Sequence, residues 1–149
     1  FGDCLEEVGM DLEQKGIELN YSNYIQPDTI VIADPEQMKK VINNIISNSV
    51  KYMNKPKGAI DIRILDEADS IRIEIEDNGR GMTQEQIYEL LTKKTKKTSG
   101  LSGIGVVNVR ERLELYYGNN AGLGYDSTSD GTTAYLYLPA YKDQNQYAV

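Results

Sequence analysis

The sequence has no histidine and only one cysteine, Cys4, in 149 residues. Without an imidazole, neither a Ser-His-Asp nor a Cys-His mechanism can operate, so any chemistry must rest on amides, carboxylates, lysines and backbone groups. A single cysteine excludes an internal disulfide and, with no histidine beside it, a zinc site built from Cys and His. It also suits a reducing compartment.

Long apolar runs and an excess of positive charge are missing too. No run approaches the roughly 20 residues needed to cross a bilayer, and no signal peptide is visible. The formal net charge is −7, which repels phosphate backbones, so we expect no nucleic-acid partner and no direct membrane contact. Because the chain starts at Phe1, we expect residues 1–149 to be one domain of a longer protein.

The spacing of apolar residues predicts alternating helices and strands, separated by glycine, proline and asparagine. An N-terminal helix and strand fill about the first 20 residues, and the tail from about 140 to 149 is expected to fray. In all, the pattern predicts helices at about 3–15, 35–52, 83–91 and 103–117, and strands at about 17–21, 30–32, 60–64, 71–75, 122–127 and 132–138.

These elements predict an α/β (α+β) two-layer sandwich, in which helices cover one face of a mixed, mostly antiparallel sheet. Isoleucines alternate over 60–64 and 71–75, which indicates a hairpin with one buried face. The short run at 30–32 is expected to pair with the strand that starts at Ile17. In the last helix, the stripe expected to face the core is formed by Val106, Val109, Leu113, Tyr116 and Tyr117. A repeating βαβ order is not seen, which disfavours doubly wound dinucleotide folds.

The helix expected at 35–52 carries the first motif. Asn44, Asn48 and Lys51 fall along one edge of it, beside an apolar face. An amide oxygen suits Mg²⁺ that still carries phosphate oxygens, and a lysine suits the phosphates themselves. The alternative interpretation is an ordinary solvated face, since Asn and Lys are common surface residues.

The second motif, Asp77-Asn78-Gly79-Arg80-Gly81-Met82, directly follows a predicted strand. Alternate glycines let the backbone approach a ligand closely, and a carboxylate at a strand end can accept a hydrogen bond from an exocyclic amine such as that of adenine. The alternative is a plain β-turn, because Asp-Asn-Gly is common turn chemistry.

The third motif, Gly100-Leu101-Ser102-Gly103-Ile104-Gly105, opens a predicted helix. Backbone N–H groups at such a start bind phosphates, helped by the helix dipole. It is not a Walker loop, because the Gly-Lys-Ser/Thr ending is absent. A flexible glycine linker that caps a helix is the alternative.

Taken in order, the motifs resemble the ATPase superfamily of gyrases, heat-shock chaperones, bacterial sensor histidine kinases and mismatch-repair proteins, with its Bergerat-type ATP-binding fold. Residues 44–52 resemble the N box of histidine kinases, residues 77–82 the first glycine box, and residues 103–113 the second. Gly131-Thr132-Thr133 resembles a further element near the adenine.

The resemblance implies a role for each matching residue. Asn48 would hold Mg²⁺, and Asn44 and Lys51 would be the catalytic candidates that support the phosphates of ATP. Asp77 would bond the adenine amine, and Tyr52 would pack on the adenine or ribose, although core packing is an equal alternative. The implied nucleotide-binding residues are Asn44, Asn48, Lys51, Tyr52, Asp77, Gly79, Gly81, Met82, Gly103, Ile104, Gly105 and Thr133, under a lid near 92–102.

Asn44 separates the kinases from the hydrolytic members of this superfamily. Gyrase-like and chaperone-like ATPases resemble this motif but have a glutamate there, four residues before the metal-binding asparagine, as the general base for water. An amide cannot take that proton, so the resemblance implies a protein-histidine kinase that transfers the γ-phosphoryl of ATP to a histidine on a separate dimerisation domain. The isolated chain is not expected to phosphorylate itself.

Implied partners are that dimerisation domain and a response regulator, with this domain cytoplasmic and its parent membrane-anchored. Two departures from the family pattern keep alternatives open: Leu101 replaces a lid glycine, and the phenylalanine-bearing box is absent or replaced by Tyr88. The chain could be a degenerate, non-catalytic module that binds nucleotide or docks a partner. It could also be an anti-sigma-type serine kinase, although those tend to carry the glutamate.

Overall fold

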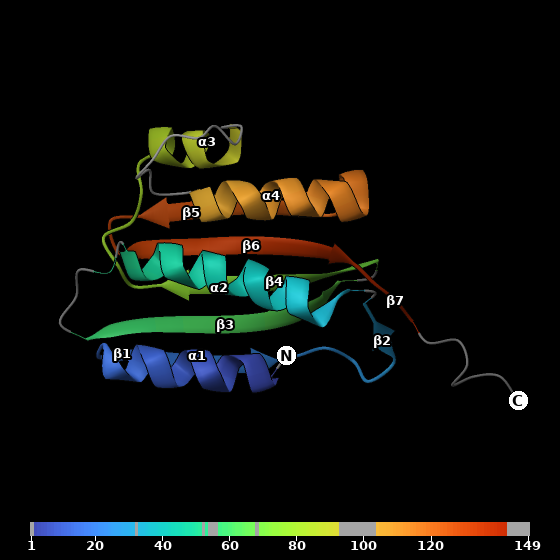
Figure 1. Ribbon diagram of the computed structural model, residues 1–149, viewed down its shortest axis with the longest axis horizontal. Coiled ribbons are helices and arrows are strands. Elements are labelled where there is room, and N and C mark those ends of the chain that lie inside the picture. The colour runs from blue at the N-terminus through green and yellow to red at the C-terminus, as the bar shows by residue number, and fades with distance from the viewer. Residues whose placement is uncertain are drawn as a thin grey trace, which may run out of the picture.

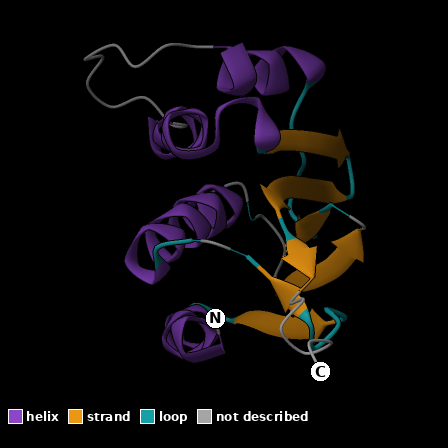
Figure 2. Ribbon diagram, turned by 90° about the vertical axis from the view of Figure 1, so that its right-hand side faces the viewer, coloured by secondary structure: helices purple, strands orange, loops and turns teal. Residues whose placement is uncertain are grey.

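A computed structural model describes residues 2–31, 33–51, 53, 57–67, 69–92 and 104–142 of the chain. Within them, helices gather on one side of a sheet, which gives the two layers seen in Figures 1 and 2. The helices are α1 (Gly2–Gln14), α2 (Pro35–Lys51), α3 (Gln84–Thr92) and α4 (Ile104–Tyr117), with a 3₁₀ turn at Gly118–Asn120. None of these helices is both long and apolar enough to cross a bilayer.

The main sheet has five strands in the order β1-β3-β4-β6-β5. Only the β1–β3 pair is parallel, and the remaining neighbours are antiparallel. The predicted mixed, mostly antiparallel sandwich is therefore confirmed. The strands are β1 (Ile17–Asn23), β3 (Gly58–Glu67), β4 (Ser70–Asp77), β5 (Gly122–Thr128) and β6 (Gly131–Pro139), while β2 (Thr29–Ile30) and β7 (Tyr141–Lys142) form a separate pair.

The core lies between α2 and the covered face of the sheet. Strand residues alternate, so every second side chain of β3, β4 and β6 points toward the helices. Helix α2 contributes a stripe at helical spacing that meets them. The buried residues that form this core include Val41, Ile42, Ile45, Ile46, Ile60, Ile62, Ile64, Ile71, Ile73, Ile75, Leu136 and Leu138.

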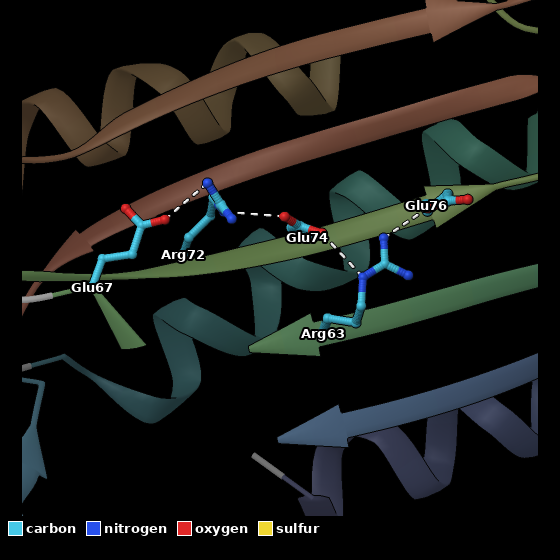
Figure 3. A network of polar contacts seen from close by, with 5 residues as sticks. All are labelled: Arg63, Glu67, Arg72, Glu74 and Glu76. Atoms are coloured by element: carbon cyan, nitrogen blue, oxygen red, sulfur yellow. Dashed lines mark hydrogen bonds and ion pairs between the residues drawn. The ribbon is translucent and has the colours of Figure 1, made fainter. Parts of the chain in front are cut away.

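The opposite face of the sheet carries a chain of ion pairs (Figure 3). Arg63 contacts Glu74 at 3.0 Å and Glu76 at 2.7 Å, and Arg72 contacts Glu67 at 2.8 Å and Glu74 at 3.0 Å. These side chains are partly exposed, so each pair contributes little to stability. Their main effect is to keep the uncovered face of the sheet polar.

The pairing expected for β1 is wrong. Strand β1 lies parallel to β3, with Leu19 opposite Ile60, whereas Thr29 and Ile30 pair with the C-terminal β7. The reason is that α2 crosses over the sheet and returns the chain beside β1, which buries Ile17 in the main core. Position 32 lies outside the described residues.

Two smaller expectations also fail. Tyr116 is 58% exposed, because it lies at the edge of the α4 stripe whose centre is formed by the buried Val109 and Leu113. The tail does not fray at about 140, since Tyr141 and Lys142 pair with β2. Residues 143–149 lie outside the described part of the chain.

Candidate functional site

Helix α2 starts at a cap and ends at the candidate site. The Asp34 carboxylate accepts hydrogen bonds from the backbone N–H groups of Glu36 at 2.9 Å and Gln37 at 3.4 Å, with Pro35 in the first helical position. Asn48 lies near the other end and is only 9% exposed, and Lys51 is the exposed last residue. Asn44 lies one turn before Asn48 and is half-buried. These three polar residues therefore lie in the last two turns of the helix, with Asn48 the most buried and Lys51 exposed.

Asp77 ends β4 as a buried carboxylate, 5% exposed. Its Oδ1 accepts hydrogen bonds from the backbone N–H groups of Gly79 at 2.9 Å and Thr132 at 3.3 Å. Burial raises the pKa of Asp77 above its ordinary value, and hydrogen bonding from Gly79, Ser49 and Thr132 opposes the rise because it favours the charged form. The result is a fixed acceptor in a water-poor position, able to take a proton donor such as an amine.

The loop after Asp77 is held by hydrogen bonds on both sides. The side chain of Asn78 accepts from the Ala59 N–H at 2.8 Å and donates to the Lys57 carbonyl at 3.2 Å. The Met82 N–H donates to the Ser127 hydroxyl at 2.7 Å. Gly79 and Gly81 between them are buried, so this segment is a rigid wall and not a free turn.

Gly81 shows why glycine is required in that wall. Its φ is +80°, and a Cβ there would lie 1.9 Å from the carbonyl oxygen of Thr128. Met82, which follows it, is 8% exposed and packs with Ile87 of α3 in a small second cluster. The spacing of the glycines thus lets the loop approach β5 closely and turns one apolar side chain inward.

The strand register corrects the expectation for Thr133. Thr133 lies opposite Glu76, on the uncovered face of the sheet, whereas Thr132 lies opposite Asp77 on the covered face. The Thr132 hydroxyl is 2.8 Å from that of Ser127, which also donates to the Gly131 carbonyl at 3.1 Å. The sequence motifs do not single out Ser49, Ser127 or Thr132. Ser49 nevertheless lies within residues 44–52, and Thr132 directly precedes Thr133.

The third motif is described only in part. Ile104 and Gly105 form the first turn of α4, while Tyr52 and Gly103 lie outside the described residues. Of the lid expected near 92–102, Thr92 ends α3 and residues 93–102 lie outside the described part of the chain. Figure 1 shows the start of α4, the end of β4 and the end of α2 at the same end of the molecule. The structure thus brings Asp77, the glycine loop and the polar end of α2 to one region, which the start of α4 borders.

A buried hydroxyl lies close to this region. The Tyr125 hydroxyl has no hydrogen-bond partner within the described residues, and its ring packs against both the main core and the Met82–Ile87 cluster. Burial raises the pKa of Tyr125, and the charge of Asp77 raises it further. This phenol therefore stays protonated and keeps an unused donor beside the carboxylate.

The donor set fits a nucleotide better than a metal held by protein alone. No group of three or more His, Cys, Asp or Glu side chains that could hold a metal occurs in the described ranges. Asn48 offers one neutral oxygen, which suits Mg²⁺ when phosphates provide the other ligands. Asp77, a buried carboxylate at the end of β4, suits an amine-bearing base.

Comparisons with known proteins agree with this arrangement. Residues 33–142 match the family described as histidine kinase-, DNA gyrase B-, and HSP90-like ATPase. The sensor protein LytS of Streptococcus mutans is 29% identical over 125 residues, which cover 84% of this chain and 21% of that protein. The sensor histidine kinase/phosphatase LytS of Staphylococcus aureus is 30% identical over 110 residues, or 71% of this chain and 19% of that protein. The chain thus spans about a fifth of these relatives.

Solved structures show the same fold. The catalytic domain of histidine kinase ThkA has a TM-score of 0.74 at 18% identity, over 93% of this chain and 91% of that one. The mycobacterial sensor histidine kinase MprB has a TM-score of 0.71 at 20% identity, over 95% and 92%. The family match over residues 33–142, which is well over half of the chain, places it in the histidine kinase-, DNA gyrase B-, and HSP90-like ATPase family.

Proposed function

We propose that this chain is the ATP-binding catalytic domain of a two-component sensor histidine kinase. In this proposal residues 1–149 form one domain that donates the γ-phosphoryl of ATP to a histidine on a separate dimerisation domain of the same parent. The observation that carries it is the buried Asp77 carboxylate, held by two backbone N–H groups beside a rigid glycine loop. That arrangement suits the exocyclic amine of adenine.

The phosphate side of the proposal rests on α2. Asn48 would hold Mg²⁺, and Asn44 and Lys51 would support the phosphates, with the backbone of Gly103, Ile104 and Gly105 opposite them. Asn44 has no basic oxygen with which to activate water, which favours transfer to another nucleophile over hydrolysis. The protein would contribute position and electrostatic stabilisation, which are the main sources of catalysis in phosphoryl transfer.

The acceptor must come from elsewhere, because the sequence contains no histidine. One of the structural neighbours, histidine kinase ThkA, was solved in complex with a response regulator protein, which supports a response regulator as the second partner here. The full-length relatives are sensor proteins. We place this domain in the cytoplasm, in a parent anchored in the membrane.

ATP titration by calorimetry, with and without Mg²⁺, tests the nucleotide site. Asp77→Asn should weaken ATP binding at least about tenfold, because its amide would present a donor to the adenine amine. Glu76→Gln is the matched control, since Glu76 is the neighbouring carboxylate on the other face of the sheet. Equal ATP affinities in the unchanged chain and Asp77→Asn would contradict the proposal.

Phosphoryl transfer needs a second measurement. Labelled ATP should leave phosphate on the parent's histidine-bearing dimerisation domain when both domains are mixed, and none on this chain alone. Phosphate on the isolated chain would overturn the assignment. Tight ATP binding without any transfer would instead favour the non-catalytic module, and transfer to a serine of a protein partner would favour the anti-sigma-type kinase.

A further inference from the structure

Asn78, in the glycine loop, is joined to the start of β3 by three hydrogen bonds. Its Oδ1 accepts from the Ala59 N–H at 2.8 Å, and its Nδ2 donates to the Lys57 carbonyl at 3.2 Å. Its own backbone N–H donates to the Ala59 carbonyl at 3.3 Å. These bonds lie beyond the end of the β3–β4 ladder, whose last pair is Ile60 with Asp77.

The register of the hairpin shows what the side chain of Asn78 replaces. One more pair in the ladder would place Ala59 opposite Asn78. In a regular hydrogen-bonded pair, each residue donates its N–H to the main-chain carbonyl of the other. The Asn78 N–H does so, but the Ala59 N–H donates to the side-chain oxygen of Asn78. The side chain therefore takes the place of the main-chain carbonyl, and the main chain can turn away from β3.

This turn brings a donor to the Asp77 carboxylate. Gly79 lies two residues after Asp77, and its N–H reaches Oδ1 at 2.9 Å across the turn at Asn78. In a strand that continued straight, a rise of about 3.3 Å per residue would carry this N–H away from the carboxylate. The Asn78 side chain thus supports the backbone geometry that fixes Asp77 at the end of β4.

We propose that Asn78 is a positioning residue for base recognition, whose side chain holds the turn after β4 and so fixes the Asp77 carboxylate for the exocyclic amine of adenine. This inference rests on the proposed function, because it assumes that Asp77 receives the base. Asn78 acts through Asp77 and takes no part in the transfer of the phosphoryl group.

Asparagine is the residue type that these two side-chain bonds require. Its short amide carries an acceptor and a donor on one planar group, so it serves the Ala59 N–H and the Lys57 carbonyl together. An aspartate could still accept from Ala59, but it has no donor for Lys57 and would place a charge against that carbonyl. Alanine would lose both bonds. The two substitutions therefore remove the side-chain contacts in steps.

The test compares two nucleotides that differ only in the 6-amine. ATP and purine riboside triphosphate, which lacks that amine, are titrated with Mg²⁺ into the unchanged chain, Asn78→Asp, Asn78→Ala and Asn119→Asp. Asn119 is the control for the added charge, because it is an exposed residue of the 3₁₀ turn before β5, whereas the glycine loop bonds Ser127 near the end of that strand. Both Asn78 variants should weaken ATP binding about tenfold and binding of the analogue less than about twofold. Asn119→Asp should change neither.

The possible outcomes separate this inference from the proposed function. If the Asn78 variants weaken both nucleotides equally, the side chain supports the fold and does not place the carboxylate, and the inference is overturned. If they weaken neither, the inference is overturned as well, while the proposed function stands. If the unchanged chain binds no ATP, the proposed function itself fails.

Circular dichroism shows whether each variant is folded. Asn78→Asp keeps the acceptor for Ala59, so it carries the test if Asn78→Ala does not fold. Loss of folding in both variants would assign Asn78 to stability alone and overturn the inference. Equal binding of ATP and the analogue by the unchanged chain would overturn it too, because no amine would then be recognised.

Discussion

Two glycines share a left-handed backbone but differ in what surrounds them. Gly81 has φ +80° and Gly16 has φ +75°. A Cβ at Gly81 would lie 1.9 Å from the Thr128 carbonyl oxygen, while nothing lies within 4 Å of one at Gly16. The pair therefore separates the cost of the backbone conformation from the cost of the collision.

Gly16→Ala should lower the free energy of unfolding by about 1 kcal/mol, the cost of a left-handed non-glycine residue. Gly81→Ala should lower it by about 3 kcal/mol or more, because β5 or the loop must also move. Urea unfolding of both variants at neutral pH measures the two losses. Equal losses would mean that the close contact with Thr128 does not hold the loop.

For single residues, the sequence predicts those whose role depends only on their near neighbours in the chain. Asp77, Gly79 and Gly81 form one short motif, and their spacing alone indicates a loop that a ligand can approach. Thr132 and Ser127 could not be chosen in the same way, because their role depends on strand register. A shift of one residue exchanges the two faces of a strand, and this is the difference between Thr133 on the uncovered face and Thr132 on the covered face.

Among the elements, α3 has a reciprocal cap that ties it to the glycine loop. The Thr83 hydroxyl accepts from the Gln86 N–H at 3.1 Å, and the Gln86 side chain accepts from the Thr83 N–H at 2.9 Å. At its other end, the Thr92 hydroxyl donates to the Tyr88 carbonyl at 2.6 Å. The same residue type thus serves the helix start and the helix end.

Thr83→Ala should lower the free energy of unfolding by about 1 kcal/mol, because it leaves N-terminal donors unpaired. Thr92→Ala is the matched control and should be neutral or slightly stabilising, since alanine is the better helix former. Urea unfolding followed by circular dichroism compares them. A loss at Thr92 as large as that at Thr83 would argue against the cap as the source of stability.

Helix ends were predictable because caps and periodicity are read over a few residues. The expected α3 at 83–91 is observed at Gln84–Thr92, and the expected hairpin is β3–β4. Long-range pairing was not predictable in the same way. Nothing within residues 17–32 indicates that β1 will pair with a strand beyond α2, because a local pattern favours the nearer apolar run as its partner.

For the molecule as a whole, Asp77 links stability to pH. Its pKa is raised above the ordinary 3.8, chiefly by burial. The folded state therefore holds a proton more tightly than the unfolded state does. This carboxyl costs stability at neutral pH, and the cost falls as pH decreases through the raised pKa and is absent below the unfolded pKa.

Asp77→Asn should therefore be more stable than the unchanged chain at pH 7. Asparagine can still accept from the N–H groups of Gly79 and Thr132, while no buried charge remains. Thermal unfolding from pH 8 to pH 4 measures the gap between the two proteins, which should close toward acid. A gap that stays constant or widens toward acid would contradict the assignment of this cost to Asp77.

Strand β1 joins the sheet along one edge only, through its parallel ladder to β3. The other four strands form a continuous antiparallel unit that contains Asp77, Thr132 and Ser127. Local opening follows such boundaries, so α1 and β1 form one unit whose release breaks a single ladder and the core contacts of Leu12 and Ile17. Mechanical load on the first helix would then detach this unit while the carboxylate and its donors stay assembled.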